Sequence, residues 1–227
     1  MRPRKRQAGA EPVKSALYGQ LARVALALGS PGRLQILEYV AQGERSVEAL
    51  ARMSGLSMAN TSKHLQALRQ AGLVTSRKEG LRVYYLLAGD DVVALISALR
   101  AVAEHRVAEV QHLVELWLAH RDEMEPVAAA ELLARAKDGL VTVLDVRPAE
   151  EYAAGHIPGA LNVPLDKLED FLSRLPKRKE VVAYCRGPYC LMSFEAVEKL
   201  RKRGWRARRL QDGFPEWRAA GLPVAEG

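Results

Sequence analysis

The sequence predicts two domains: a mainly helical domain with a β-hairpin, followed by an α/β domain with a parallel sheet. The chain has 227 residues, which is long for one small domain and ordinary for two. Apolar residues recur at helical spacing through the first 120 residues, apart from one pair of β-rich runs. After residue 127 short apolar strands alternate with helical stretches, which is typical of a parallel sheet covered by helices.

Four segments follow from these patterns. They are a basic disordered tail over 1–14, a first domain over 15–120, a linker over 121–126 and a second domain over 127–227. The tail begins Met1-Arg-Pro-Arg-Lys-Arg6, and no apolar segment follows it, so it does not read as a secretory signal. A basic arm that contacts DNA phosphates is the alternative to a disordered tail. No run of eighteen apolar residues occurs, so no membrane span is expected.

The first domain is expected to hold several helices and one hairpin. Ser30 and Ser46 are placed to cap the second and third helices. The hairpin turns at Glu79-Gly80. The expected helices cover 15–29, 31–41, 46–53, 57–71 and 91–120, and the hairpin strands cover 73–78 and 82–87. An apolar stripe marks the last helix: Val92, Leu95, Leu99, Val102, Val110, Leu113 and Leu116.

The second domain is expected to alternate strands and helices. Its strands cover 141–146, 161–163, 181–184 and 207–210, and its helices cover 132–137, 166–175 and 193–203.

The net charge of +7 is distributed unevenly. Residues 1–89 carry 14 Lys and Arg against 5 Asp and Glu, whereas residues 90–125 carry 3 against 8. Residues 126–227 are nearly balanced, with 17 against 14. A basic block confined to the first ninety residues indicates a polyanion partner for that part of the chain.

The helix expected over 57–71 has two different faces. Met58, Thr61, Leu65 and Leu68 share one side and are expected to face the core. The opposite face is small and polar at its N-terminal end, the end that enters a major groove in a helix-turn-helix. Asparagine suits adenine, lysine suits guanine or phosphate, and hydroxyl and imidazole groups suit phosphates. The candidate DNA-binding residues are Ser57, Asn60, Ser62, Lys63, His64 and Gln66.

Three segments together resemble the ArsR-type winged helix-turn-helix repressors. They are Leu56-Ser-Met-Ala-Asn-Thr-Ser-Lys-His-Leu65, Leu68-Arg-Gln-Ala-Gly-Leu-Val74 and Glu79-Gly-Leu-Arg-Val-Tyr-Tyr-Leu86. The resemblance covers about residues 15–120. It implies binding to double-stranded operator DNA, a homodimer joined through the first and last helices, and repression that a ligand releases.

The metal sites of this family are not expected here. Many relatives bind metal through cysteines of the third helix, but the segment Arg45-Ser-Val-Glu-Ala-Leu-Ala51 contains none. Other relatives use carboxylates and histidines of the last helix. Asp91, His105, Glu109 and His112 are the candidates for such a site, but their spacing does not match the family pattern. The sequence therefore predicts no metal and no cofactor.

Four separated motifs of the second domain resemble the rhodanese domain in order and spacing. They are Leu144-Asp-Val-Arg147, Glu151-Tyr-Ala-Ala-Gly-His-Ile-Pro-Gly-Ala160, Val182-Ala-Tyr-Cys-Arg-Gly187 and Leu210-Gln-Asp-Gly-Phe-Pro-Glu-Trp217. The match covers about residues 127–224. Asp212 departs from the family, which usually has a glycine there. Five residues of these motifs are expected to be packed scaffold and not catalysts: Asp145, Arg147, His156, Phe214 and Trp217.

Cys185 is the candidate catalytic nucleophile. It ends an expected strand and begins the loop Cys185-Arg-Gly-Pro-Tyr-Cys190, which opens a helix. Backbone N–H groups and the helix N-terminus are expected to stabilise its thiolate, lowering the pKa from about 8.5. Arg186 is expected to bind an anionic donor such as thiosulfate. Gly187, Pro188, Tyr189 and Cys190 complete the expected substrate-binding loop.

The loop also discriminates between two reactions. Cysteine phosphatases and related arsenate reductases need an arginine six positions after the nucleophile, and Leu191 stands there. Transfer of sulfur through a persulfide on Cys185 is therefore predicted instead of phosphoryl transfer. Cys190 has two interpretations: a small space-filling residue, or a resolving thiol that closes a disulfide with Cys185.

The two cysteines are too few for a disulfide-stapled secreted protein, so a cytoplasmic protein with a reactive thiol is predicted. The sequence as a whole predicts a DNA-binding transcriptional regulator that is coupled to reactive-sulfur chemistry. Its expected partners are a DNA operator, a sulfur donor such as thiosulfate or a persulfide, and a second copy of the chain. Two functional forms stay open: a working sulfurtransferase, and a sensor whose cysteines change state without turnover.

Overall fold

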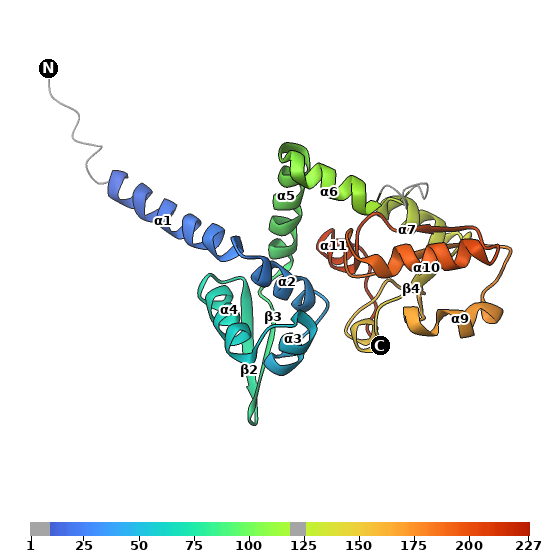
Figure 1. Ribbon diagram of the computed structural model, residues 1–227, viewed down its shortest axis with the longest axis horizontal. Helices are drawn as coiled ribbons and strands as arrows, with labels where there is room; N and C mark the ends of the chain where they lie inside the picture. The colour runs from blue at the N-terminus through green and yellow to red at the C-terminus, as the bar shows by residue number, and fades with distance from the viewer. Residues whose placement is uncertain (1–9, 119–125) are drawn as a thin grey trace, which may run out of the picture. The chain divides into compact units, whose positions relative to one another are not determined.

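The computed structural model describes residues 10–118 and 126–227 (Figure 1). It divides into two compact units. The N-terminal unit comprises the described residues up to Val40 and from Glu44 to Gly89. The C-terminal unit comprises Ala41–Gly43 and the described residues from Asp90 onward. Within the described ranges no helix is long and apolar enough to cross a membrane.

The N-terminal unit is a winged helix-turn-helix. Its elements are α1 (Ala10–Leu28), α2 (Pro31–Val40), β1 (Arg45–Ser46), α3 (Val47–Ser54), α4 (Met58–Gln70), β2 (Val74–Glu79) and β3 (Arg82–Leu87). The strands form an antiparallel sheet in the order β1-β3-β2, and β2 and β3 make the protruding wing (Figure 1).

Side-chain caps define the two helices of the helix-turn-helix. Ser46 caps α3 by accepting a hydrogen bond from Ala49 N at 3.2 Å, and Ser57 caps α4 by accepting one from Asn60 N at 3.3 Å. Between them Gly55 ends α3 with a φ of 66°, which glycine adopts without steric cost. The fully buried core side chains beneath these helices are Ile36, Leu37, Leu50, Leu65 and Leu68.

The C-terminal unit is an α/β fold preceded by two helices. The helices are α5 (Asp90–Arg106), α6 (Ala108–Leu118), α7 (Ala129–Lys137), α8 (Ala149–Ala153), α9 (Leu168–Phe171), α10 (Leu191–Lys202) and α11 (Phe214–Ala219). The strands are β4 (Val141–Asp145), β5 (Leu161–Asn162), β6 (Glu180–Tyr184) and β7 (Ala207–Arg209). They form the predicted parallel sheet, and its strand order is β5-β4-β6-β7.

The parallel sheet is packed on both faces, because alternate residues of each strand point to opposite sides. On one face Leu144 and Val181 pack with Val197 and Leu200 of α10. On the other face Val143 and Val182 lie in a cluster with Trp217. The central strands β4 and β6 are therefore buried on both sides, and their carboxyl ends are held firmly where the candidate nucleophile follows.

Two expectations about the helices need correction. The first helix begins at Ala10, so residues 10–14 are helical and not part of a disordered tail, while residues 1–9 lie outside the described part. The helix expected over 91–120 is two helices that meet at a bend at Val107 (Figure 1). No glycine or proline marks this break; the Val107 carbonyl accepts from both Val110 N and Gln111 N and so starts α6.

Smaller differences concern single residues and short elements. Met58 was expected in the core, but its side chain is 46% exposed because it lies in the first turn of α4, beyond the packed surface. The helices α8 and α11 and the strand β1 were not predicted, since all three are too short to show a periodic pattern. The compact units place α5 and α6 with the α/β fold, whereas the sequence grouped them with the first domain. The expected linker lies almost wholly outside the described residues.

Candidate functional site

The predicted DNA-binding residues lie along the N-terminal half of α4. Ser57, Asn60, Lys63 and Gln66 are exposed. Ser62 and His64 are half-buried. The His64 ring lies against the start of α2, where a Cβ added to Gly32 would be 3.1 Å from its Nε2. Four of the six predicted residues are therefore exposed, on α4 or at its N-cap.

Cys185 lies where β6 ends and the loop to α10 begins, as predicted. Its side chain is buried, with 2% of the residue exposed. The Sγ atom is 3.5 Å from the carbonyl oxygen of Cys190 and 3.5 Å from Ser193 Oγ. It is 3.9 Å from the carbonyl oxygen of Gly187. The sulfur is therefore enclosed by the loop and by the first turn of α10.

The state of the Cys185 sulfur differs from the sequence-based expectation. Burial raises the pKa of the Cys185 thiol well above its usual value, and the neighbouring Cys190 raises it further. Ser193 and the backbone of Gly187 act in the opposite direction but do not outweigh burial. The expected lowering of this pKa is therefore wrong for the resting loop, because the loop encloses the sulfur and removes it from water.

Cys190 is the cysteine with the lowered pKa. The hydrogen bond from Cys185 is the largest cause, and burial opposes it. The backbone of Arg186 and Met192 and the charge of Arg186 lower this pKa further. Cys190 is also the N-cap residue of α10, a position that favours a thiolate. The two pKa values are therefore shifted in opposite directions: Cys185 holds its proton more tightly, and Cys190 loses its proton more readily.

The Arg186 side chain points to a buried carboxylate. Its Nη2 is 2.7 Å from Glu151 Oε1, and its Nε contacts both carboxylate oxygens. Glu151 is 1% exposed, whereas 19% of the Arg186 side chain is exposed. This pairing holds the start of the loop to α8, so an anionic donor would share a guanidinium that already has a partner.

Tyr189, at the tip of the loop, contacts α5. Its hydroxyl donates a hydrogen bond to the Glu104 carboxylate, and burial and this carboxylate together raise the pKa of the tyrosine. The guanidinium of Arg100 lies 5.3 Å from the ring centre and pairs with Glu216 of α11 at 3.3 Å. The loop that carries Cys185 is therefore connected to the helix that follows the wing in the chain.

Gly213 lies against the loop backbone. A Cβ at this position would come within 3.0 Å of the Gly187 nitrogen and the Arg186 carbonyl group. The next residue, Phe214, donates its N–H to the carbonyl oxygen of Cys185 at 3.0 Å. Glycine is required here for close approach and not for its φ angle, since −103° is open to any residue.

The residues expected to be scaffold are packed as predicted. Asp145 and Arg147 are both fully buried, and Arg147 Nη2 contacts Asp145 Oδ2 at 2.6 Å. His156 is 7% exposed and stacks on Tyr152 with ring centres 3.7 Å apart. Phe214 and Trp217 lie in the core. These buried residues form the packed part of the unit that supports the Cys185 loop.

Sequence reasoning missed several residues around the loop. Ser193 was placed only in a helix, although its position three residues after Cys190 puts it on the first turn facing the sulfur. Glu151 was quoted in a motif without a role. The burial of Gln42 could not be predicted, because a single polar residue that follows a helical pattern is usually the exposed end of the helix.

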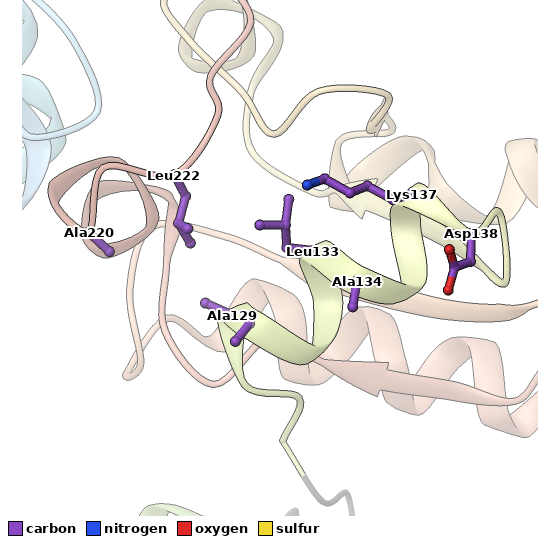
Figure 2. A pocket seen from close by; sticks show the side chains of 8 residues that line it. Ala129, Leu133, Ala134, Lys137, Asp138, Ala220 and Leu222 are labelled. Atoms are coloured by element: carbon purple, nitrogen blue, oxygen red, sulfur yellow. The ribbon is translucent and has the colours of Figure 1, made fainter.

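The C-terminal unit also contains a pocket that is separate from the Cys185 loop. Figure 2 shows it beside α7, lined mostly by small or apolar side chains, and its volume is about 610 Å³. None of residues 185–190 lines it. In the described ranges no group of three or more histidine, cysteine, aspartate or glutamate side chains is arranged to hold a metal ion.

The comparisons with known proteins agree with both units. Residues 30–76 match the family model "Bacterial regulatory protein, arsR family", and residues 128–220 match "Rhodanese-like domain". The chain is 47% identical over 224 residues to the HTH-type transcriptional regulator Rv0324 of Mycobacterium tuberculosis, covering 97% of this chain and 96% of the relative.

Two other relatives each match one part of the chain. A sulfurtransferase of Allochromatium vinosum is 33% identical over 104 residues, which is 45% of this chain and 94% of that protein. A solution structure described as a homodimeric winged helix-turn-helix DNA-binding domain from Mycobacterium bovis is 43% identical. It covers 47% of this chain and 94% of its own, with a TM-score of 0.40.

Fold, site and comparisons together define a transcriptional regulator with a winged helix-turn-helix and a rhodanese-like domain. The chain belongs to the ArsR family of bacterial regulatory proteins, in the form that carries a C-terminal rhodanese-like domain.

Proposed function

We propose that this regulator binds its operator as a homodimer, accepts sulfane sulfur on Cys185, and changes its DNA affinity when it does so. The observation that carries the proposal is the Cys185 loop itself. It holds two cysteines whose pKa values are shifted in opposite directions, and its Tyr189 hydroxyl contacts Glu104 of α5. A chemical change at the sulfur therefore has a direct structural route to a helix that continues the DNA-binding unit in sequence.

The sulfur chemistry begins with Cys185 attacking the outer sulfur of a donor such as thiosulfate. The S–S bond of thiosulfate breaks, sulfite leaves with its electron pair, and the thiol proton passes to the Cys190 thiolate. The persulfide on Cys185 then gives its outer sulfur to cyanide as thiocyanate, and the proton returns from Cys190. Cys190 acts in this scheme as the proton acceptor that a buried thiol requires.

In the sensor form the same persulfide meets Cys190 instead of an external acceptor. The Cys190 sulfur attacks the inner sulfur and gives the proton it had accepted to the outer sulfur, which leaves as hydrosulfide, so that a Cys185–Cys190 disulfide remains. Comparing thiosulfate:cyanide turnover with stoichiometric trapping of sulfur on Cys185 distinguishes the two forms. Sustained thiocyanate release supports the transferase, and one product per chain supports the sensor. If neither thiocyanate release nor sulfur trapped on Cys185 is detected, both forms are contradicted.

The homodimer is supported by uncovered apolar side chains on two elements. On α1 Val13, Leu17, Tyr18 and Leu21 are each about 60% exposed, and on α6 Leu113 and Leu116 are more than half exposed. Apolar stripes of this kind indicate a surface that another chain covers. The name of the Mycobacterium bovis domain describes that protein as homodimeric.

DNA binding through α4 is tested by two substitutions. Lys63→Ala and Asn60→Ala each remove an exposed side chain from the groove-facing surface, so both are expected to weaken operator binding. Loss of a base contact costs about 1–3 kcal/mol, and loss of one phosphate contact lowers the salt slope by about one. Fluorescence anisotropy at several salt concentrations measures both quantities, with Lys177→Ala in the C-terminal unit as the matched control. Unchanged binding by both α4 variants would show that another surface reads the DNA.

A further inference from the structure

Gln42 is a buried amide whose contacts lie in the C-terminal unit. It belongs to the three-residue connection Ala41–Gly43 between α2 and β1 and is 1% exposed. Its Nε2 donates to the carbonyl oxygen of Arg186 at 3.1 Å, and its Oε1 accepts from Arg147 Nη1 at 3.1 Å. Burying an amide is costly unless it is hydrogen-bonded, so these bonds make the contact specific.

The Arg186–Gly187 peptide links Gln42 to the reactive sulfur. A peptide unit is planar and rigid, so its C=O and N–H groups move together. The C=O of this unit, on Arg186, accepts from Gln42. The next residue of the loop, Gly187, has its carbonyl oxygen 3.9 Å from the Cys185 sulfur. Gly213 packs directly against the same peptide unit.

The Cys185 sulfur is closely surrounded by protein atoms. It is 2% exposed, and oxygens of Cys190 and Ser193 lie 3.5 Å away. Protein interiors are close-packed, so an added sulfur must displace the surrounding loop atoms. The displaced groups include the Gly187 carbonyl group, and the Arg186 carbonyl that Gln42 holds lies one residue before it in the same loop.

We propose that Gln42 is a positioning residue that ties the Arg186–Gly187 peptide to the connection leading into the helix-turn-helix, so that persulfidation of Cys185 shifts this connection. The inference rests on the proposed function. Gly43 follows with a φ of 140°, a turn open to glycine, and Ser46 then caps α3. A movement at Gln42 is therefore passed along four residues of chain to the start of the first helix of the DNA-binding motif.

The test compares operator affinity before and after sulfur loading in matched variants. The DNA probe is a duplex selected for wild-type binding from a random-sequence library, and polysulfide is the sulfur source. Gln42→Leu removes both hydrogen bonds. Gln42→Glu keeps the acceptor for Arg147 but places a carboxylate beside the Arg186 carbonyl. Gln211→Leu changes an exposed glutamine of the same unit and is the control. Mass spectrometry measures sulfur on Cys185 in each protein.

Wild type and Gln211→Leu are expected to change affinity on loading by about 5- to 150-fold, as allosteric couplings commonly do. Both Gln42 variants are expected to take up sulfur equally but to change affinity less than about twofold. In wild-type protein, hydrogen exchange of residues 43–46 is expected to change on loading. Equal affinity changes in wild type and both Gln42 variants, or unaltered exchange at 43–46, would overturn the role of Gln42. A wild-type protein that loads sulfur without any affinity change would overturn the proposed function itself.

Discussion

Replacing Cys185 by serine is expected to reduce thiosulfate:cyanide sulfur transfer to the uncatalysed rate. The reaction needs a sulfur atom that attacks the donor and then carries the transferred sulfur as a persulfide. A serine hydroxyl does neither at neutral pH. The substitution is nearly isosteric, so the loop should keep its fold. Thiocyanate release measured against time is the assay. Transfer by the Cys185→Ser protein at a rate near wild type would contradict the assignment of the nucleophile.

Cys190→Ser is the matched control for this loss. It removes the thiol with the lowered pKa, which is the proposed proton acceptor, but leaves the proposed nucleophile at the end of β6. Transfer is therefore expected to fall but to stay measurable, because water or the donor itself can take the proton more slowly. A complete loss in both variants would mean that Cys190 carries a covalent step as well.

The second large effect concerns the buried ion pair beneath the loop. Asp145→Ala leaves the fully buried Arg147 without its carboxylate partner, whose oxygens accept from the Nε and Nη2 of Arg147. Removing one partner of a buried pair costs about 3–5 kcal/mol of unfolding free energy. Denaturant unfolding followed by the fluorescence of Trp205 and Trp217 reports on this unit.

Glu198→Ala is the control for the buried pair. Glu198 contacts Lys202 at the surface of α10, with 44% and 72% of the two side chains exposed. Exposed pairs contribute about 0–1 kcal/mol, so little loss is expected. Equal losses for Asp145→Ala and Glu198→Ala would contradict the structural importance of the buried pair.

Several features were predicted because the physics that produces them is local in sequence. Ser46 caps a helix through a residue three positions further along the chain, and β2 and β3 pair across one tight turn. Cys185 was placed at the end of a strand because an apolar run stops there and a loop with glycine and proline follows. The parallel sheet followed from the alternation of short strands and helices.

The features that were missed depend on contacts between distant residues. Burial of the Cys185 sulfur, and hence its raised pKa, results from how the loop closes over it, and the loop sequence alone indicated exposed backbone amides. The Glu151–Arg186 pair and the Gln42 amide join residues 35 and 144 positions apart in the chain. The bend at Val107 could not be predicted, because no glycine or proline occurs there.

The central claim is that the sulfur state of Cys185 controls DNA binding, and one measurement tests it directly. Operator affinity is determined at one fixed salt concentration for reduced wild-type protein, polysulfide-treated wild-type protein and polysulfide-treated Cys185→Ser protein. The account predicts that treatment shifts the wild-type affinity about 5- to 150-fold and leaves the variant equal to reduced wild type. Equal affinities in all three samples would contradict it, and would leave a regulator whose two domains share a chain but act independently.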